Sequence, residues 1–176
     1  MERLPEPQTL ADGKFIRLVR RGKWEYASRK GISGIVAIVA VTDDGKLVLV
    51  EQDRAPVGSR VIELPAGLAG DDKAHHGEEL ASAARRELLE ETGYEAARFE
   101  RVAEGPPSAG MTDEIITFFV ARGLRKAGEA KGDGSEDIAV HEVPLGEIDR
   151  WLADRKQEGR RIDLKVYAGL YFARRS

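Results

Sequence analysis

The sequence predicts an α+β or α/β sandwich that is preceded by an antiparallel β-hairpin. Three observations lead to this prediction. Short β-branched runs separated by turn residues fill the first part of the chain, one strong helix lies near the middle, and two further helices lie near the end. Strands and helices mixed in this way pack as layers around one core. The 176 residues suffice for one domain with a small appendage.

The first elements are expected to form the appendage. Residues 14–19 alternate between polar and apolar side chains, Arg21 and Gly22 form a turn, and residues 23–26 return as the second strand of the hairpin. We therefore divide the chain into an N-terminal β extension, residues 1–32, and a main domain, residues 33–176. The extension is expected to serve dimerisation or substrate binding.

Three strands are expected at the start of the main domain. Residues 34–41 form a β-branched run that fits a central strand buried on both faces. After a turn at Asp43-Asp44-Gly45, residues 46–52 are expected to return as its partner strand. Residues 60–64 form a further short strand, which Pro65 ends.

The rest of the chain is expected to be mostly helices and shorter strands. Residues 78–91 are rich in strong helix formers, and Gly93 is placed to end this helix with a left-handed cap. The other elements are expected in this order: a polar loop at 68–77, strands at 98–102 and 115–120, a mobile loop at 126–135, a last strand at 140–144, and helices at 145–154 and 164–172.

Composition excludes several classes of protein and site. The formal charge of −3, from 31 acidic and 28 basic residues, argues against bulk nucleic-acid binding. The chain has no cysteine, so thiolate metal sites and thiol nucleophiles are excluded. The N-terminus lacks the apolar core of a secretory signal, and the longest apolar run is too short to cross a bilayer. We expect a cytoplasmic protein without a membrane partner.

The helix at 78–91 gathers three carboxylates. Residues three and four positions apart share one face of a helix, so Glu87, Glu90 and Glu91 are expected to lie close together. Clustered carboxylates repel each other unless a positive charge lies among them, and Mg²⁺ prefers such oxygen ligands. Arg86, one turn from Glu90, could orient that glutamate. The alternative is a solvated acidic face, which is the usual explanation of a glutamate-rich helix.

The order of these residues resembles the Nudix box. Residues 86–94 read Arg-Glu-Leu-Leu-Glu-Glu-Thr-Gly-Tyr, Glu78 lies eight positions before Arg86, and the strand 62–67 lies just upstream. The resemblance implies the Nudix fold, an α/β/α sandwich. One departure concerns the loop ahead of the helix, because ten residues separate Gly67 from Glu78 where the family usually has five. We interpret this difference as an insertion that leaves the metal-binding half intact and makes a role for Glu78 less important.

The resemblance implies hydrolysis of a nucleoside diphosphate linked to another group. Glu87, Glu90 and Glu91 would bind Mg²⁺ or Mn²⁺ together with the carbonyl of Ala66, and Arg86 and Glu91 would be catalytic residues. Many relatives take a general base from a late loop, where Glu136 is the first candidate. Glu136 could equally cap the next strand. Asp133, Glu114 or a box glutamate are the other candidates for the base.

Motifs outside the box resemble the subgroup that acts on ADP-ribose and other nucleoside diphosphate sugars. They lie at residues 24–25, 51–54, 64–67 and 109–114. In this subgroup the N-terminal hairpin commonly crosses a dimer interface, so a homodimer is expected. The alternatives are hydrolysis of nucleoside triphosphates or dinucleoside polyphosphates, and a binding module that senses a nucleotide without cleaving it. The complete set of box glutamates argues against the binding module.

Four residues are expected to contact the substrate. Arg54 could clamp a phosphate or form an ion pair with Glu51 or Glu63, and Glu63 itself is placed among the substrate-binding residues. Trp24 could stack on a base or be buried in the hairpin. Glu114 could contact the terminal sugar or end a loop.

The three histidines have simpler explanations. His75 and His76 lie in the inserted loop, where a metal role is possible but solvation is the usual explanation. His141 lies in an expected strand and is interpreted as structural.

Overall fold

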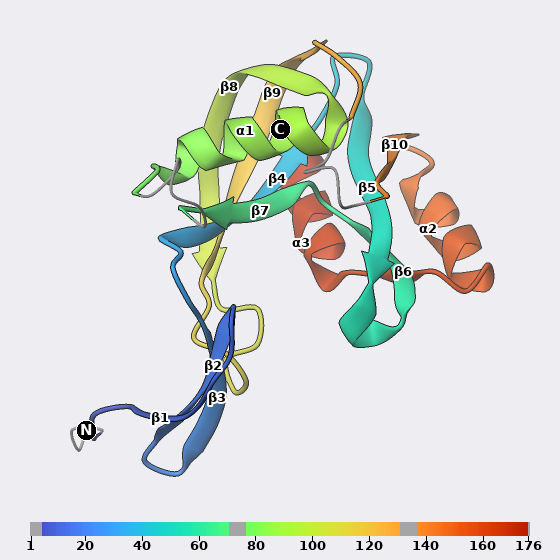
Figure 1. Ribbon diagram of the computed structural model, residues 1–176. Coiled ribbons are helices and arrows are strands. Elements are labelled where there is room, and N and C mark those ends of the chain that lie inside the picture. Colours follow the sequence, from blue (N-terminus) through green and yellow to red (C-terminus); the bar gives the residue numbers. More distant parts are fainter. Residues whose placement is uncertain (1–4, 71–76, 131–136, 176) are drawn as a thin grey trace.

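The computed structural model describes residues 5–70, 77–130 and 137–175, which form a two-sheet body and a projecting N-terminal sheet (Figure 1). The central sheet of the body has the strand order β7-β4-β9-β8. These strands span Ala66–Ala69 (β7), Gly34–Ala40 (β4), Ile116–Lys126 (β9) and Tyr94–Gly105 (β8). β4 runs parallel to β9 and antiparallel to β7, so both of its edges are paired within the sheet.

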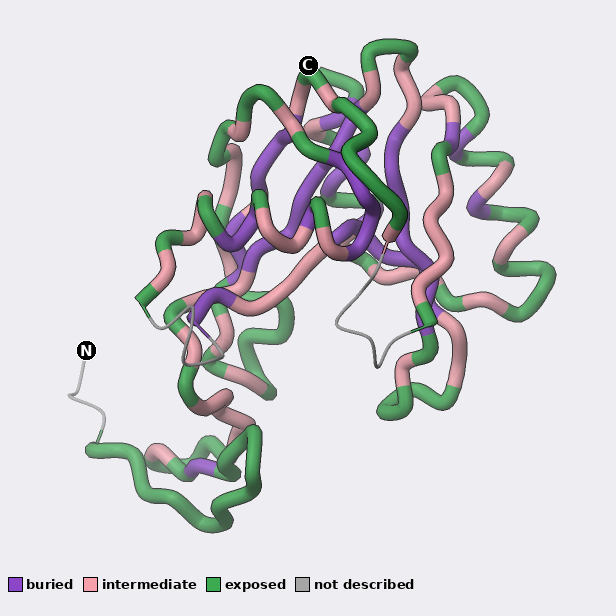
Figure 2. The backbone as a smooth tube through the Cα atoms, turned by 45° about the horizontal axis from the view of Figure 1, so that its top comes forward, coloured by how far each residue is buried: buried purple, intermediate pink, exposed green. Residues whose placement is uncertain are grey.

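Helices cover the two faces of this sheet. Helix α1 (Leu80–Thr92) packs on one face, where Leu88 meets Val36 and Ile38 of β4. Helix α3 (Leu164–Ala173) packs on the other face, where Val166 meets Val39. Because successive strand residues point to opposite faces, the β-branched run of β4 supplies both cores at once. The buried segments in the middle of the body show this clearly (Figure 2).

The second sheet of the body has the order β10-β5-β6-β11. Its strands span Ala139–Pro144 (β10), Lys46–Arg54 (β5), Ser59–Glu63 (β6) and Arg161–Ile162 (β11). A 3₁₀ turn at Ala55–Val57 joins β5 to β6, and helix α2 (Ile148–Gln157) lies between β10 and β11 in the chain. Buried Ile148 and Leu152 attach α2 to the core that α3 shares with this sheet.

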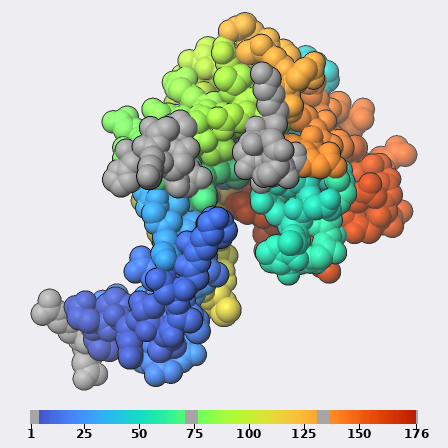
Figure 3. Space-filling view, viewed as in Figure 1, coloured from blue at the N-terminus to red at the C-terminus, as the bar shows by residue number. Residues whose placement is uncertain are grey.

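The N-terminal sheet contains β1 (Gln8–Asp12), β2 (Ile16–Arg21) and β3 (Trp24–Arg29), paired antiparallel in sequence order. It stands out from the body as a separate lobe (Figure 3). Val19 is its one buried apolar residue among the described residues, while Ile16 and Leu18 are 48% and 42% exposed. Three strands without a covered apolar face have little stability of their own.

The α+β class and the antiparallel N-terminal hairpin are confirmed, and the hairpin gains a third strand, β1. The prediction that residues 46–52 pair with residues 34–41 is wrong. Only Val41 and Leu47 form a bridge, because β7 and β9 already occupy both edges of β4, and β5 therefore joins the second sheet.

The expected loop at 68–77 is also partly wrong, since β7 extends to Ala69. The described part of the expected loop at 126–135 begins one residue later, because Lys126 ends β9. β11 lies after the strand expected to be the last. Helix α1 begins at Leu80 rather than Glu78, because Glu79 has extended backbone, and it ends at Gly93 with φ of 71° as expected. Within the described residues, no helix is long and apolar enough to cross a membrane.

Candidate active site

The carboxylate helix lies against β7, and two of its glutamates contact that strand. The backbone N–H of Ala66 donates a hydrogen bond of 2.9 Å to Oε2 of Glu91, whose residue is only 6% exposed. A Cβ atom on Gly67 would lie 1.9 Å from Cδ of Glu87. Only glycine therefore allows the Glu87 carboxylate to lie directly on the strand, and the Pro65-Ala66-Gly67 segment and the helix fit each other as one unit.

Arg86 lies among the other carboxylates of this helix. Its Nη1 donates to Glu87 at 2.8 Å and to Glu90 at 3.0 Å, and its Nη2 donates to the Leu68 carbonyl at 2.9 Å and to Glu78 at 3.2 Å. We call Arg86, Glu78, Glu87 and Glu90 the box cluster. Burial alone would lower the pKa of the Arg86 guanidinium, but the carboxylates outweigh it and raise that pKa above its ordinary value.

The box cluster has one positive charge for three carboxylates, with side-chain exposures of 11% for Glu78, 12% for Glu87 and 44% for Glu90. Glu78 thus contacts Arg86 directly, which the enlarged loop ahead of the helix had led us not to expect. The place of Glu78 in the box pattern, eight residues before Arg86, was the signal for this contact, although Glu78 itself lies before the start of α1.

The donors of this site suit a hard divalent cation, because they are carboxylate and carbonyl oxygens beside a strand in which glycine leaves room for them. No group of three or more His, Asp or Glu side chains is arranged to hold a metal within the described residues. Glu87 and Glu90 are directed at Arg86 instead. The site therefore fits such a cation by ligand chemistry, and binding would require these two carboxylates to turn away from Arg86.

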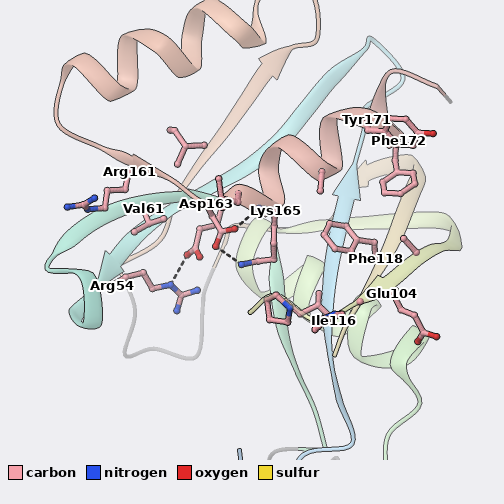
Figure 4. Close-up of a pocket in the computed structure, with 18 of the residues that line it drawn as sticks. Arg54, Val61, Glu104, Ile116, Phe118, Arg161, Asp163, Lys165, Tyr171 and Phe172 are labelled. Atoms are coloured by element: carbon pink, nitrogen blue, oxygen red, sulfur yellow. Dashed lines mark hydrogen bonds and ion pairs between the residues drawn. The ribbon is translucent and has the colours of Figure 1, made fainter. Parts of the chain in front are cut away.

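A large cavity of about 960 Å³ lies on the α3 side of the central sheet, and it contains two of the expected substrate residues. Arg54 donates to Glu63 at 2.7 Å, which is one of the two ion pairs considered for it (Figure 4). The Glu63 side chain is 8% exposed, and burial raises its pKa although Arg54 opposes this effect. Glu63 lies three residues before Ala66, so one short segment connects this cavity to the box helix.

The walls of this cavity were not found from the sequence. Phe118 and Phe172 form an apolar wall with ring centroids 6.2 Å apart, and Asp163 and Lys165, which also line the cavity, form an ion pair (Figure 4). Asp163 also accepts a hydrogen bond from the backbone N–H of Lys165 and caps α3. An Asp directly before an apolar helix was a signal for the cap, but nothing in the sequence indicated that the cap faces a cavity.

The remaining substrate candidates lie on or beside the N-terminal sheet rather than in the cavity. Trp24 is 52% exposed, and one atom of its ring would lie 3.8 Å from a Cβ atom placed on Gly110. Glu114 accepts a hydrogen bond of 2.8 Å from Arg29. The backbone N–H of Ala27 donates to the Met111 carbonyl at 2.9 Å, which fixes the loop before β9 to the N-terminal sheet.

Several expected functional residues lie outside the described residues. They are the candidate bases Glu136 and Asp133 and the loop histidines His75 and His76. Asp137, the next described residue, accepts a hydrogen bond of 3.1 Å from Arg60.

A second charged cluster lies at the second sheet. From the sequence, only His141 was expected to be structural, and Glu51 was considered as a partner of Arg54 rather than of these residues. Glu51, 6% exposed, accepts hydrogen bonds from Arg60 at 2.9 Å and from Arg160 at 3.2 Å, and its Oε2 lies 2.9 Å from His141 Nε2. We call these four residues the Glu51 cluster. Burial opposes ionisation of Glu51, but its three partners together hold its pKa below the ordinary value.

Comparison with known proteins agrees with this geometry. Residues 33–165 match the NUDIX domain. The chain is 39% identical over 124 residues to a methanol dehydrogenase activator of Bacillus methanolicus and 38% identical over 124 residues to an ADP-ribose pyrophosphatase of Bacillus subtilis (strain 168). Each of these matches covers 70% of this chain and 64% of the relative, so the match spans less than two thirds of either relative's length.

A solved structure described as an ADP compounds hydrolase shares the fold. It superposes with a TM-score of 0.74 over 98% of this chain and 92% of its own, at 21% identity. This likeness includes the N-terminal extension as well as the body.

Proposed function

This chain belongs to the Nudix family, and we propose that it is a Mg²⁺-dependent pyrophosphohydrolase of nucleoside diphosphate sugars such as ADP-ribose. Its products would be a nucleoside monophosphate and a sugar phosphate. The observation that carries this proposal is the close packing of helix α1 on β7. Glu87 lies directly against Gly67, and Glu91 accepts a hydrogen bond from the backbone of Ala66. The chain reaches β7 directly from Glu63, which pairs with Arg54 in the large cavity. The relationship to the ADP-ribose pyrophosphatase of Bacillus subtilis supports this choice of substrate class.

The proposed chemistry depends on charge. A pyrophosphate is polyanionic, and the box carboxylates alone would repel it. When bound, Mg²⁺ neutralises that charge and lowers the pKa of the attacking water. Glu87, Glu90, Glu91 and the Ala66 carbonyl are the groups we propose to hold the cation. Arg86 would then keep Glu78, to which it already donates a hydrogen bond of 3.2 Å, as its carboxylate partner.

We assign substrate binding to the cavity beside β6 and to the N-terminal sheet. Arg54 is 40% exposed, so its guanidinium can exchange the Glu63 carboxylate for phosphate oxygens, which it matches with two parallel hydrogen bonds. Glu63 would hold Arg54 in place between turnovers. Trp24 and Glu114 lie about the N-terminal sheet, where we propose that they contact the base and the sugar.

We propose Glu136 as the general base, on the strength of its place in the chain. Asp137, the next residue, accepts a hydrogen bond from Arg60 of β6. Replacing Glu136 by Gln should reduce kcat on the order of 10²-fold or more, as expected for loss of general-base catalysis. A loss of only a few-fold would assign the base to another group.

The sheet within the N-terminal extension, residues 1–32, supports a proposal of a homodimer. Leu18 and Ile16 leave one face of β2 apolar and exposed, and this sheet buries too little of its surface to be stable alone. A second copy of the chain would cover it. We expect Leu18→Ser to convert dimers to monomers in analytical ultracentrifugation, while Val57→Ser, at an exposed position of the body, leaves the mass unchanged. A monomeric parent protein would contradict this proposal.

A substrate panel tests the proposed activity. ADP-ribose, GDP-mannose, a nucleoside triphosphate and a dinucleoside polyphosphate are each incubated with enzyme and Mg²⁺, and phosphate is measured after phosphatase coupling. We expect the nucleoside diphosphate sugars to be cleaved fastest, and EDTA to stop the reaction until Mg²⁺ is restored. Preference for a triphosphate would exclude the proposed substrate class. Metal-independent cleavage would exclude the proposed role of the box.

A further inference from the structure

A second cavity of about 530 Å³ lies between the central sheet and the end of α3, on the face opposite α1. Its charged lining residues are mostly arginines: Arg98, Arg101, Arg122 and Arg175, with Glu100 as the one carboxylate. We call this cavity the arginine cleft. The chain as a whole is acidic, so four arginines around one small cavity are a local exception.

The register of the sheet forces two of these arginines together. Arg98 of β8 lies directly opposite Arg122 of β9, and directly opposed like charges in a sheet destabilise it. Arg98 lies 3.5 Å from Glu100, but the two side chains are 71% and 61% exposed, so water weakens this pair. Glu100, the one carboxylate that lines the cleft, therefore balances the opposed pair only weakly, and Glu104, which pairs with Arg101, does not line it.

Arg122 is the most informative member of the cleft. Its Nη2 is buried, and it has neither a hydrogen-bond partner nor an ion-pair partner among the described residues. A buried donor of a charged group is normally satisfied by a partner, by water or by a bound ion. Within the described residues, this charged donor of Arg122 therefore has no acceptor from the protein itself.

Arg175 forms the opposite wall in a fixed orientation. Its guanidinium lies 4.7 Å from the centre of the Tyr171 ring, and its Nη1 donates to the Tyr171 hydroxyl at 2.7 Å. Tyr171 and the neighbouring Phe172 lie together on α3, and both also line the larger cavity (Figure 4). The cleft therefore offers guanidinium groups on two walls, one from the sheet and one from the turn that follows α3.

We propose that the arginine cleft binds a phosphate group, either inorganic phosphate or the terminal phosphate of a small phosphomonoester. A tetrahedral dianion accepts hydrogen bonds from several guanidinium groups at once, satisfies Arg122 and separates the charges of Arg98 and Arg122. This site is distinct from the box helix, which lies on the other face of the central sheet. It does not depend on the proposed hydrolase activity.

Calorimetric titration with inorganic phosphate, in EDTA and without divalent cations, tests this proposal. The wild-type protein should bind phosphate with a Kd of about 1 mM or tighter. Arg122→Gln and Arg175→Gln should each weaken binding about tenfold, the expected effect of losing one charge-assisted pair. Arg125→Gln is the matched control, because Arg125 lies on the same strand, is 71% exposed and does not line the cleft.

Two further arms distinguish the sources of the signal. Arg54→Gln removes the guanidinium of the larger cavity and any phosphate bound there, and the binding that Arg122→Gln weakens should persist in this variant. Titration with AMP and with ribose 5-phosphate then separates a phosphomonoester from inorganic phosphate as the preferred ligand. The proposal is overturned if the wild-type protein does not bind phosphate, if Arg125→Gln weakens binding as much as Arg122→Gln, or if Arg54→Gln abolishes it. Circular dichroism establishes whether each variant is folded. If Arg122→Gln does not fold, the phosphate affinity of Arg175→Gln tests the proposal.

Discussion

The box cluster and the Glu51 cluster are made from the same kinds of side chain but have opposite charge balance. In the box cluster one arginine serves three carboxylates, whereas in the Glu51 cluster two arginines and a histidine serve one carboxylate. The first set has an excess of negative charge that an added cation can satisfy. The second is satisfied by the protein itself. The comparison teaches that charge balance, rather than the number of ionisable groups, separates a candidate metal site from a structural network.

The largest effect is expected from Glu91→Gln. This substitution keeps the size of the side chain but removes the charge beside Ala66, so turnover should fall on the order of 10³-fold if Glu91 acts as a metal ligand or base. Steady-state kinetics with ADP-ribose measures this loss. Glu79→Gln is the control, because Glu79 precedes α1 and makes no side-chain cap. Near-normal turnover in Glu91→Gln would contradict the proposed role of Glu91 as a metal ligand or base.

Addition of Mg²⁺ should distinguish the two clusters without any substrate. At about 100 times its Kd a ligand stabilises the folded state by about 2.7 kcal/mol, which corresponds to a rise of roughly 5–10 °C in Tm for a domain of this size. We expect Glu87→Gln to reduce this rise in differential scanning calorimetry. Substitution at Glu51 should leave it intact. An equal rise in both variants would mean that the cation binds elsewhere.

Glu51→Ala should destabilise the fold and leave the activity per folded molecule unchanged. Removing the shared carboxylate leaves two arginines without it, and we expect a loss of about 2 kcal/mol, less than for a fully buried pair because both arginines reach water. Since the pKa of Glu51 is lowered, its contribution is present above the ordinary carboxyl pKa and disappears as pH falls. Urea unfolding of the wild type and of Glu51→Ala at pH 7 and about pH 3 measures the contribution of Glu51 to the free energy of unfolding at each pH.

Asp53→Asn is the matched control, because Asp53 lies on the same strand but its side chain is 72% exposed. This substitution should change the free energy of unfolding little. A difference between wild type and Glu51→Ala that stays constant with pH would contradict the linkage to Glu51 ionisation.

Glu63→Gln should have the smallest effect and the opposite pH dependence. Burial raises the pKa of Glu63, so the stability it contributes is present below the ordinary carboxyl pKa and is lost as pH rises through the raised value. At pH 7 the variant should be as stable as wild type or slightly more stable, within about 1 kcal/mol, because Arg54 is exposed enough to be solvated. A large loss of stability at pH 7 would place Glu63 with Glu51 among the structural carboxylates.

The sequence alone determined the local features of this protein. Helix α1, its end at Gly93 and the shared face of Glu87, Glu90 and Glu91 follow from helix propensity and the 3.6-residue period, which depend only on neighbouring residues. The pattern of the box and the buried run of β4 were visible for the same reason.

Only the tertiary structure decided which strands pair and which distant charges meet. β5 joins the second sheet because both edges of β4 are taken, a competition that local pattern does not encode. Glu51 and Arg160 are 109 positions apart, and Arg98 meets Arg122 only through the register of β8 and β9. Packing of distant segments creates these contacts, and with them the cavities and the charge balance that give each cluster its role.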